Sequence, residues 1–309
     1  MISATLYSDP ACPWAYSESP ALRVLEWRYG DQLDWRLVLI GLSEDASRYQ
    51  SHGYTPLRGA LGHLKFRRYG MPFSPSPKER MSATARACRA VVAARLAEPG
   101  SEWRVFRALQ LANFTTPLLL DDDAQLADVL RGGSVLDADA IIASLDDPEV
   151  TVAYQRDRAE ARRAAGSPSE LQGKTASSDG PVRYTAPSVV FELAGRRLEA
   201  GGFQPVEAYD VLVANLDPHL ERKPVPDSPA PLLEHFSDGV TTQEVAALLA
   251  DGNDAPDRDQ AEAALLALVA AGDAVRTPLG DDALWLRGHA PADGAVRSSD
   301  RRRTLSVVE

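Results

Sequence analysis

The order of apolar and polar positions predicts a β-α-β unit at the start of the chain. Residues Ile2–Tyr7 form a short apolar run that is typical of a strand. A helical pattern that includes Leu22 and Leu25 follows and ends at Gly30. Residues Leu33–Gly41 first alternate and then become continuously apolar, which predicts a central strand parallel to the first. A right-handed crossover would place the helix on one face of this sheet.

Helical periodicity replaces this pattern from about residue 44 to residue 166. Several segments begin with Asp or Ser, which favour the N-cap position of a helix. Ser82 is the predicted cap of a helix that runs to Ala97 and carries Cys88. The predicted helices span residues 56–70, 82–97, 101–113, 122–130, 137–144 and 148–165. A block of this size is too regular to be a loop, so we expect a helical domain, residues 44–181, inserted into the α/β unit.

The α/β pattern resumes beyond this block. The polar, Gly- and Ser-rich residues 167–181 predict a flexible connection. A strand at Ala186–Leu193, a tight turn and a returning strand then precede a helix at Val206–Leu216. Residues 1–43 and 182–216 are therefore expected to form one α/β domain, in the order β-α-β, helical insertion, β-β-α.

A Pro-rich segment separates the last part of the chain. Residues 217–231 contain five prolines and few large apolar side chains, which predicts a stiff linker and a domain boundary. Residues 232–290 then show three helical segments and a hairpin, a pattern that resembles a small winged-helix-like domain. The polar tail, residues 291–309, has no periodicity and is expected to be disordered.

The charge of the chain argues against nucleic acid and membranes as partners. The 309 residues carry a formal net charge of −11 at pH 7, which disfavours binding to phosphate or to anionic lipid. In the winged-helix-like segment three arginines stand against eleven acidic residues, so DNA would repel a recognition helix there. We expect this segment to contact a protein partner or to cover the first domain.

The composition also bears on compartment and cofactors. No apolar run approaches the roughly 18–20 residues of a membrane span, and the N-terminus lacks the basic start and apolar core of a signal peptide. Two cysteines, Cys12 and Cys88, are too few for a disulfide framework and fit a reducing, cytoplasmic setting. No His/Cys grouping has metal-ligand spacing, so we expect no metal and no bound cofactor.

The chemistry that the sequence suggests is centred on Cys12. This cysteine stands where the first strand gives way to a helix, and Pro13 suits the first helical position because its missing N–H would be unpaired anyway. The free N–H groups and the positive helix end favour the thiolate, so we expect a lowered pKa and a reactive thiol. The alternative is that Cys12 is a small buried apolar residue, as most unpaired cysteines are.

The segment Asp9–Tyr16 reads Asp-Pro-Ala-Cys-Pro-Trp-Ala-Tyr, and with the predicted element order it resembles the DsbA-like thiol–disulfide oxidoreductases. It is most similar to the branch with FrnE-type proteins, 2-hydroxychromene-2-carboxylate isomerases and mycothiol-dependent reductases. Over residues 1–216 the resemblance implies a thioredoxin-like fold with an inserted helical domain and Cys12 as nucleophile. It also implies that Pro187 is a cis-proline opposite the cysteine. The backbone of Ala186, just before it, would pair with a bound thiol or peptide.

One position departs from the family pattern. Ala15 replaces the second cysteine of Cys-x-x-Cys, which a dithiol enzyme uses to resolve the mixed disulfide. Cys12 must then be released by a low-molecular-weight thiol such as glutathione or mycothiol, or by Cys88 if the insertion brings it within disulfide range. A buried, inert Cys88 is the competing interpretation. A third is that the site has lost redox chemistry and only binds a ligand.

Two function hypotheses follow. The candidate substrate-binding residues are Pro13, Trp14, Tyr16, Ala186 and Pro187, although Tyr16 fits the core equally well. The first hypothesis is a thiol-dependent oxidoreductase or transferase that forms a mixed disulfide on Cys12 with a small thiol or a protein. The second is a non-catalytic ligand-binding or adaptor protein that uses the thioredoxin-like cleft and the winged helix to bind partners.

Overall fold

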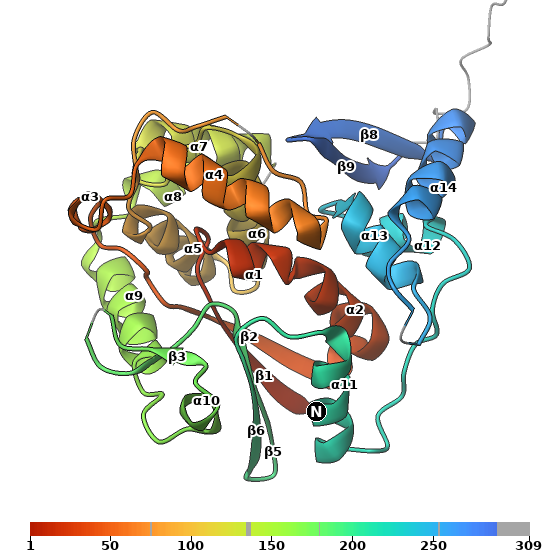
Figure 1. Cartoon of the computed structure of the whole chain (residues 1–309), viewed down its shortest axis with the longest axis horizontal. Coiled ribbons are helices and arrows are strands. Elements are labelled where there is room, and N and C mark those ends of the chain that lie inside the picture. Colours follow the sequence, from red (N-terminus) through yellow and green to blue (C-terminus); the bar gives the residue numbers. More distant parts are fainter. Residues whose placement is uncertain (75, 134–136, 179, 253, 289–309) are drawn as a thin grey trace, which may run out of the picture.

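A four-stranded sheet forms the centre of the α/β unit (Figure 1). The computed structural model describes residues 1–74, 76–133, 137–178, 180–252 and 254–288, so the predicted tail at 291–309 lies outside them. The strands are β1 (Ile2–Ser8), β2 (Leu33–Leu39), β5 (Ser188–Leu193) and β6 (Arg196–Gly201), in the order β2-β1-β5-β6. Strand β1 is parallel to β2 and antiparallel to β5, so the sheet is mixed.

Strand β2 lies at the edge of the sheet, so the prediction of a central strand is wrong. Helix α9 (Pro148–Ala161) and the rest of the insertion bury its apolar residues, where a second neighbouring strand was expected. Side chains also satisfy its backbone: Asp157 accepts from the Leu39 N–H at 3.1 Å, and Arg95 donates to the Leu37 carbonyl at 2.9 Å. An edge strand covered in this way carries the apolar pattern of an interior strand.

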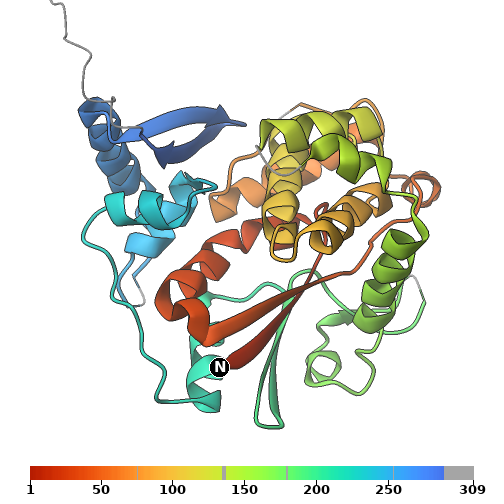
Figure 2. The ribbon, with the colours of Figure 1, turned by 180° about the vertical axis from the view of Figure 1, so that it is seen from behind.

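Two helices connect β1 to β2 where the pattern predicts one. Helix α1 (Pro13–Ser17) and helix α2 (Ser19–Tyr29) meet at Glu18, whose side chain is buried. Helix α2 ends at Gly30 as predicted, and the 3-10 turn η1 (Gly30–Gln32) follows. Helix α11 (Val206–Leu216) has the predicted bounds and packs against α2, β5 and β6 (Figure 2).

The predicted helical insertion lies between β2 and β5. It comprises α3 (Ser47–Ser51), α4 (Pro56–Phe66), the 3-10 turn η2 (Arg67–Tyr69), α5 (Ala85–Ala97), α6 (Glu102–Thr115), α7 (Asp123–Gly132), α8 (Ala138–Ala143) and α9. The Ala-rich helix α5 is buried within it. Thr84 precedes this helix where Ser82 was predicted to cap it, because the Ser43 carbonyl accepts from the N–H groups of Thr84 and Ala85 at 3.0 and 3.1 Å.

The segment that returns the chain to the sheet is more ordered than the prediction of a flexible connection. Residues 167–181 include helix α10 (Pro168–Leu171) and strand β3 (Thr175–Ala176), and β3 pairs with β4 (Arg183–Tyr184). The buried Glu199 carboxylate accepts from both the N–H and the hydroxyl of Ser169, at 3.1 and 2.8 Å. The polar residues of this segment therefore form hydrogen bonds that order it, and their presence does not indicate flexibility.

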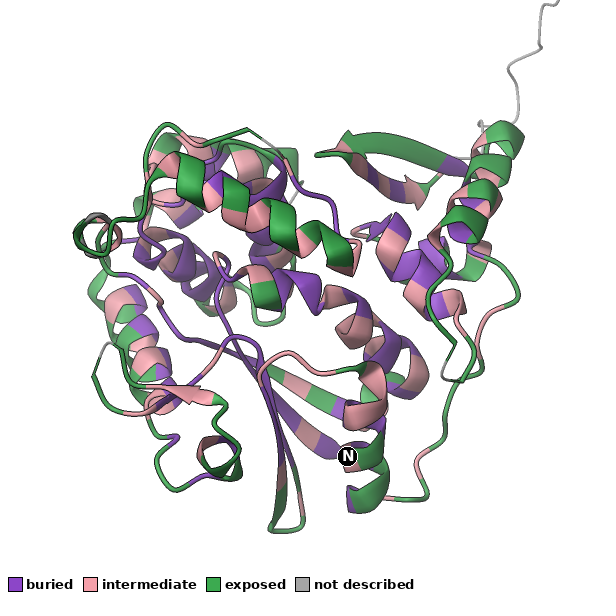
Figure 3. Ribbon diagram, in the orientation of Figure 1, coloured by how far each residue is buried: buried purple, intermediate pink, exposed green. Residues whose placement is uncertain are grey.

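The C-terminal unit, residues 230–288, packs on the α/β unit. Its elements are α12 (Ala230–His235), β7 (Val240–Thr241), α13 (Thr242–Leu249), α14 (Arg258–Ala271), β8 (Ala274–Leu279) and β9 (Asp282–Arg287), with strand order β7-β9-β8. Val24 and Trp27 of α2 belong to its hydrophobic core, and buried residues line the side of α13 that meets α2 (Figure 3). No helix in the described part of the chain is long and apolar enough to cross a membrane.

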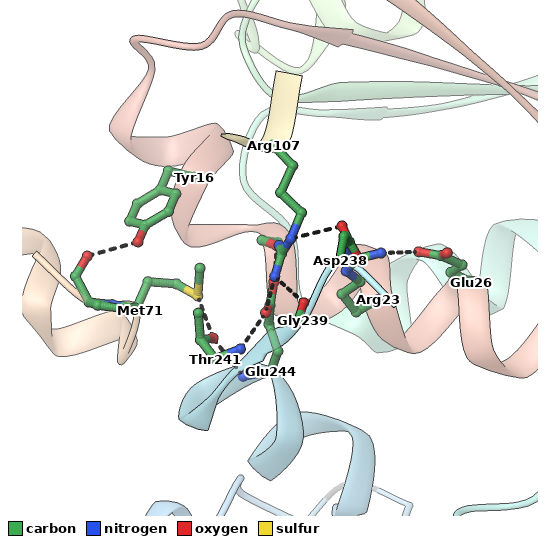
Figure 4. A network of polar contacts seen from close by, with 11 residues as sticks. Tyr16, Arg23, Glu26, Met71, Arg107, Asp238, Gly239, Thr241 and Glu244 are labelled. Atoms are coloured by element: carbon green, nitrogen blue, oxygen red, sulfur yellow. Dashed lines mark hydrogen bonds and ion pairs between the residues drawn. The ribbon is translucent and has the colours of Figure 1, made fainter. Parts of the chain in front are cut away.

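A buried ion pair connects the C-terminal unit to the insertion (Figure 4). Arg107 on α6 donates to both carboxylate oxygens of Glu244 on α13, at 2.7 and 2.8 Å, and to the Gly239 carbonyl at 2.8 Å. Glu244 is fully buried. Burial alone would raise its pKa, but the charge and hydrogen bonds of Arg107 outweigh burial and lower the pKa of Glu244 to about 2. This contact thus joins segments more than 100 residues apart.

The turn of the β8–β9 hairpin makes a second contact with the insertion. Asp281 accepts from the Phe73 N–H at 2.7 Å and pairs with Arg67 at 2.8 Å. Gly280 has a φ of +58°, and a Cβ there would lie 3.0 Å from the Phe73 carbonyl carbon. Only glycine combines this backbone conformation with so close an approach. The hairpin tip is therefore occupied by contacts within the chain.

Candidate active site

The structure brings Cys12 together with Ala186 and Pro187, as the sequence predicts. Cys12 is the N-cap residue of α1, with extended backbone angles (φ −85°, ψ 114°), and is 7% exposed. Its Sγ donates a hydrogen bond to the Ala186 carbonyl at 2.9 Å. The Ala186–Pro187 peptide bond is cis. A thiol at a helix start thus faces the backbone before a cis-proline, 174 residues away.

Asp9 holds the turn that presents Cys12. Its carbonyl accepts from the Cys12 N–H at 3.1 Å, and its carboxylate accepts from the Ala11 N–H at 2.9 Å. The same carboxylate accepts from the Leu42 N–H at 2.8 Å and the Thr84 hydroxyl at 3.1 Å. It thereby links the end of β1 to the loop after β2 and to the residue that precedes α5. Sequence reasoning assigned Asp9 no role, although an Asp before Pro at a turn is a signal for such hydrogen bonding.

The electrostatic environment of Cys12 favours the thiol. Its pKa is raised to about 12 by burial and, to a smaller extent, by the Asp9 charge, against the opposing effect of the N–H groups of Ala15 and Trp14 and of the Arg183 charge. A sulfur must also be protonated to donate to the Ala186 carbonyl. The expectation of a lowered pKa is therefore wrong. Loss of water around the sulfur raises the pKa of Cys12 by more than the N-terminus of the five-residue helix α1 lowers it.

Alkylation of Cys12 should accordingly be slow at neutral pH. With a pKa near 12 in place of the usual 8.5, the thiolate fraction at pH 7 falls by about 10³-fold. We expect the iodoacetamide rate, followed by intact mass in a Cys88→Ser variant, to keep rising up to about pH 10. A rate that levels off below about pH 8 would show instead that Cys12 is a thiolate in the resting protein.

Trp14 lies at the protein surface next to the thiol. It is 40% exposed, and its ring packs against Phe66 at 4.9 Å and against Tyr69 and Phe203 at 5.6 Å each between centroids. These aromatic rings come from α1, α4, η2 and the loop after β6. Pro13, at the first position of α1, is partly buried. Both predicted residues thus follow Cys12 in α1, and Trp14 is the more exposed of the two.

Tyr16 points into the core, so the prediction that it lines the cleft is wrong. Its ring stacks on Phe114 at 4.6 Å and meets the edge of Phe73 at 5.2 Å. Its hydroxyl donates to the Pro72 carbonyl at 2.8 Å (Figure 4). A buried tyrosine with a satisfied hydroxyl has a packing role. The partners of Tyr16 belong to the insertion, so nothing near it in the sequence indicates its direction.

Cys88 is buried on α5 and its thiol faces Asp9. It is fully buried, and its Sγ donates to the Asp9 carboxylate at 3.6 Å. Burial and the Asp9 charge raise the pKa of Cys88 well above its ordinary value. Both cysteines are free thiols. Burial of this kind favours the interpretation of Cys88 as an inert residue over that of a resolving thiol.

Arg183 is a site residue that sequence reasoning missed. It lies in strand β4, is buried, and donates to the Tyr184 carbonyl at 3.0 Å. Its charge is the cationic contribution that lowers the pKa of Cys12. The predicted strand starts at Ala186, so the short strand before it, with the arginine, was not expected. Among the described residues, no group of three or more His, Cys, Asp or Glu is placed to hold a metal ion.

Comparison with protein families identifies this arrangement. The model of the DSBA-like thioredoxin domain matches residues 5–175, which is more than half of the chain. The chain belongs to this family. Its members are DsbA-like thiol oxidoreductases, and the DsbA-like thioredoxin fold that the sequence predicts is confirmed. The match contains Cys12, whereas Pro187 and the C-terminal unit lie beyond its end.

Solved structures that resemble this DsbA-like chain cover about 70% of it. A probable DsbA oxidoreductase from Streptomyces coelicolor is 18% identical with a TM-score of 0.54, over 73% of this chain and 93% of that one. A candidate protein disulfide isomerase from Nitrosomonas europaea is 19% identical with a TM-score of 0.53, over 71% and 98%. The cytosolic disulfide reductase DsbM from Pseudomonas aeruginosa is 19% identical with a TM-score of 0.49, over 69% and 98%. Such identities show the fold alone. A search of curated protein sequences finds no match.

Proposed function

We propose that this chain is a DsbA-like thiol oxidoreductase that works through one nucleophilic cysteine, Cys12, and an external thiol. The hydrogen bond from the Cys12 sulfur to the Ala186 carbonyl, beside the cis peptide of Pro187, carries this proposal. Ala15 is buried in the first turn of α1, where the family pattern has a second cysteine. With Cys88 buried on α5, a second thiol has to come from outside the chain.

The reaction would proceed in two exchanges. Cys12 first loses its proton, and its thiolate attacks one sulfur of a disulfide RSSR, forming a Cys12–SR bond while RS⁻ leaves and takes up a proton. A second thiol, R′SH, then attacks the R sulfur as its thiolate and forms RSSR′. The Cys12 sulfur leaves as a thiolate and is reprotonated. Glutathione and mycothiol are the proposed co-substrates, and a small disulfide or a protein disulfide is the proposed substrate.

Substrate binding would itself activate Cys12. In the resting protein the Ala186 carbonyl accepts from the Cys12 thiol. An N–H of a bound peptide or peptidic thiol that donates to this carbonyl would take the acceptor away from the S–H group. The sulfur would then be free to turn toward the disulfide, with the N–H groups of Ala15 and Trp14 and the charge of Arg183 favouring its thiolate.

Incubation with oxidised glutathione at about pH 9 tests this proposal, since the thiolate fraction rises with pH. We expect one glutathione per chain by intact mass, located on Cys12 by peptide mapping and removed by dithiothreitol. The adduct should be absent in Cys12→Ser and retained in Cys88→Ser. In an Ala15→Cys variant the adduct should resolve into an internal disulfide, because the thiol then lies in the same helix turn. A chain that forms its adduct on Cys88, or none at all, would refute the proposal.

The remaining expectations form part of the same proposal. We propose that the C-terminal unit is a winged-helix-like domain, supported by its order of helices and strands, and that it does not bind nucleic acid. We also propose a cytoplasmic setting without a bound cofactor or metal. The assignment to the branch of FrnE-type proteins and mycothiol-dependent reductases remains a prediction.

A second candidate function rests on the burial of Cys12. A thiol that is 7% exposed with a raised pKa also suits a non-catalytic protein that binds ligands in the thioredoxin-like cleft. Such a protein would give no glutathione adduct on Cys12 and would bind small thiols and their non-thiol analogues equally well. Calorimetry with oxidised glutathione, which can exchange with Cys12, and with S-methylglutathione, which cannot, separates the two functions.

A further inference from the structure

Helix α4 exposes a row of leucines on its outer face. Leu57, Leu61 and Leu64 are 60%, 52% and 38% exposed, and their spacing of four and three residues places them on one side of the helix. Another side of the helix packs inward, where His63 and Phe66 contact the ring of Phe73. The outward face of α4 is largely solvent-exposed (Figure 3). An apolar row on the water-facing side of a helix is a signal for an interaction surface.

The C-terminal end of α4 lies beside the candidate active site. Phe66 at the end of α4 packs on Trp14, two residues after Cys12, and Trp14 is itself exposed. Tyr54 is exposed just before the start of α4. Trp14, Tyr54 and the three leucines make up five of the twelve exposed large apolar side chains among the described residues. Five of the exposed apolar side chains thus lie on α4, just before its start or, in the case of Trp14, at its C-terminal end.

The same segment carries a strong positive charge. Residues 46–78 contain six Lys and Arg and no Asp or Glu, so they carry +6, while the rest of the chain carries −17. Arg58 lies over the Tyr54 ring at 4.9 Å and Arg68 over the Tyr69 ring at 4.8 Å. Within the described residues, neither arginine has a carboxylate partner, whereas Arg67 pairs with Asp281. These two cations are therefore available to acidic groups of a partner.

We propose that the outer face of α4, formed by Tyr54, Leu57, Arg58, Leu61, Leu64 and Lys65, docks a polypeptide substrate with apolar and acidic side chains beside its disulfide-bonded cysteine. This rests on the proposed function, since it names the substrate class of the Cys12 site. Helix α4 has eleven residues and is about 16 Å long. An extended peptide spans that length with about five residues. A tripeptide thiol bound to Cys12 would reach little of it, so the length favours a polypeptide.

Disulfide exchange with two model peptides tests the docking surface. Each peptide has one cysteine, activated as a mixed disulfide with thionitrobenzoate; one is rich in Leu, Asp and Glu, and in the other Lys replaces the acids. Attack by Cys12 forms the Cys12–peptide disulfide and releases coloured thionitrobenzoate. We expect the acidic peptide to react at least about tenfold faster than the basic one, with an advantage that shrinks in high salt.

A triple variant, Leu57→Ser, Leu61→Ser and Leu64→Ser, should lose about tenfold in rate with the acidic peptide and react normally with oxidised glutathione. The matched control, Val152→Ser with Leu171→Ser, removes exposed apolar side chains elsewhere and should react normally with both. Loss of neither activity in the triple variant would overturn the docking proposal and leave the proposed Cys12 chemistry standing. Loss of both would also overturn it, because the leucines would then be needed for the Cys12 site itself and not for binding the peptide.

Docking can also be measured without chemistry. In a Cys12→Ser protein, anisotropy of a labelled acidic peptide with serine for cysteine should report binding that the triple leucine variant loses. If Cys12 reacts with no disulfide but this binding remains, the proposed function fails and the docking surface stands. If the peptide does not bind but vesicles of phosphatidylglycerol do, and the triple variant releases them, the surface is a membrane contact and the docking proposal is overturned.

Discussion

Replacing Arg107 by alanine should lower the free energy of unfolding by about 3–5 kcal/mol. The substitution leaves the fully buried Glu244 carboxylate without its counter-charge and the Gly239 carbonyl without the 2.8 Å hydrogen bond it accepts. Urea denaturation at pH 7 measures the loss. The matched control is Arg131→Ala, because Arg131 is exposed and pairs with two exposed carboxylates; there we expect less than about 1 kcal/mol.

The pH dependence gives a second measurement of the same pair. The pKa of Glu244 is about 2 in the folded protein, below its ordinary value of 4.5. Its contribution is therefore present above about pH 4.5 and is lost as the pH falls through about 2. The difference between wild type and Arg107→Ala should be largest near neutral pH and shrink in acid. A difference below about 1 kcal/mol at pH 7 would show that the ion pair is not needed to hold the C-terminal unit.

Glu18→Gln should remove a large fall in stability between about pH 4.5 and 8. Glu18 is buried where α1 meets α2 and accepts from the Gln204 N–H at 3.3 Å. Burial raises its pKa to about 8, so the folded chain keeps a proton that the unfolded chain releases above pH 4.5. Stability is then fully present below pH 4.5 and decreases up to pH 8, by about 4 kcal/mol.

Urea denaturation at pH 5 and pH 8 measures this effect. The wild-type chain should be less stable at pH 8, and Glu18→Gln should be similarly stable at both because glutamine stays neutral. Glu149→Gln, an exposed carboxylate at the start of α9, is the matched control and should behave as wild type does. Equal wild-type stability at the two pH values would mean that Glu18 is ionised in the folded protein.

Elements with strong periodicity and clear end signals were predictable from the sequence. Helix α11 has the predicted bounds Val206–Leu216, and α13 and α14 begin directly after Thr241 and Asp257, whose side chains cap them. The break at Glu18 and the edge position of β2 were not predictable. Both depend on contacts with distant segments, such as the hydrogen bond between Glu18 and Gln204 and that between Leu39 and Asp157.

The residues of the candidate site likewise fall into those that the sequence predicts and those that it does not. Cys12, Ala186 and Pro187 were recognisable because a local motif marks each of them. Arg183 and the packing of Tyr16 were not, because burial by segments far along the chain decides them. The prediction of a lowered pKa for Cys12 failed for the same reason. The helix start can be read from neighbouring residues, whereas the loss of water around the sulfur depends on the whole fold.

The contact at Gly280 bears on how this chain can be shortened. The Pro-rich residues 217–229 suggest a natural place to end a truncated version, since no helix or strand crosses it. A chain ending there would uncover the part of Phe73 on which the hairpin tip rests, expose Val24 and Trp27 to water, and leave Arg107 without Glu244. Newly exposed apolar surface of this kind promotes aggregation. The residues before the Pro-rich segment therefore need the C-terminal unit to stay soluble, although the two are separate in the sequence. We expect that the chain has to be produced whole.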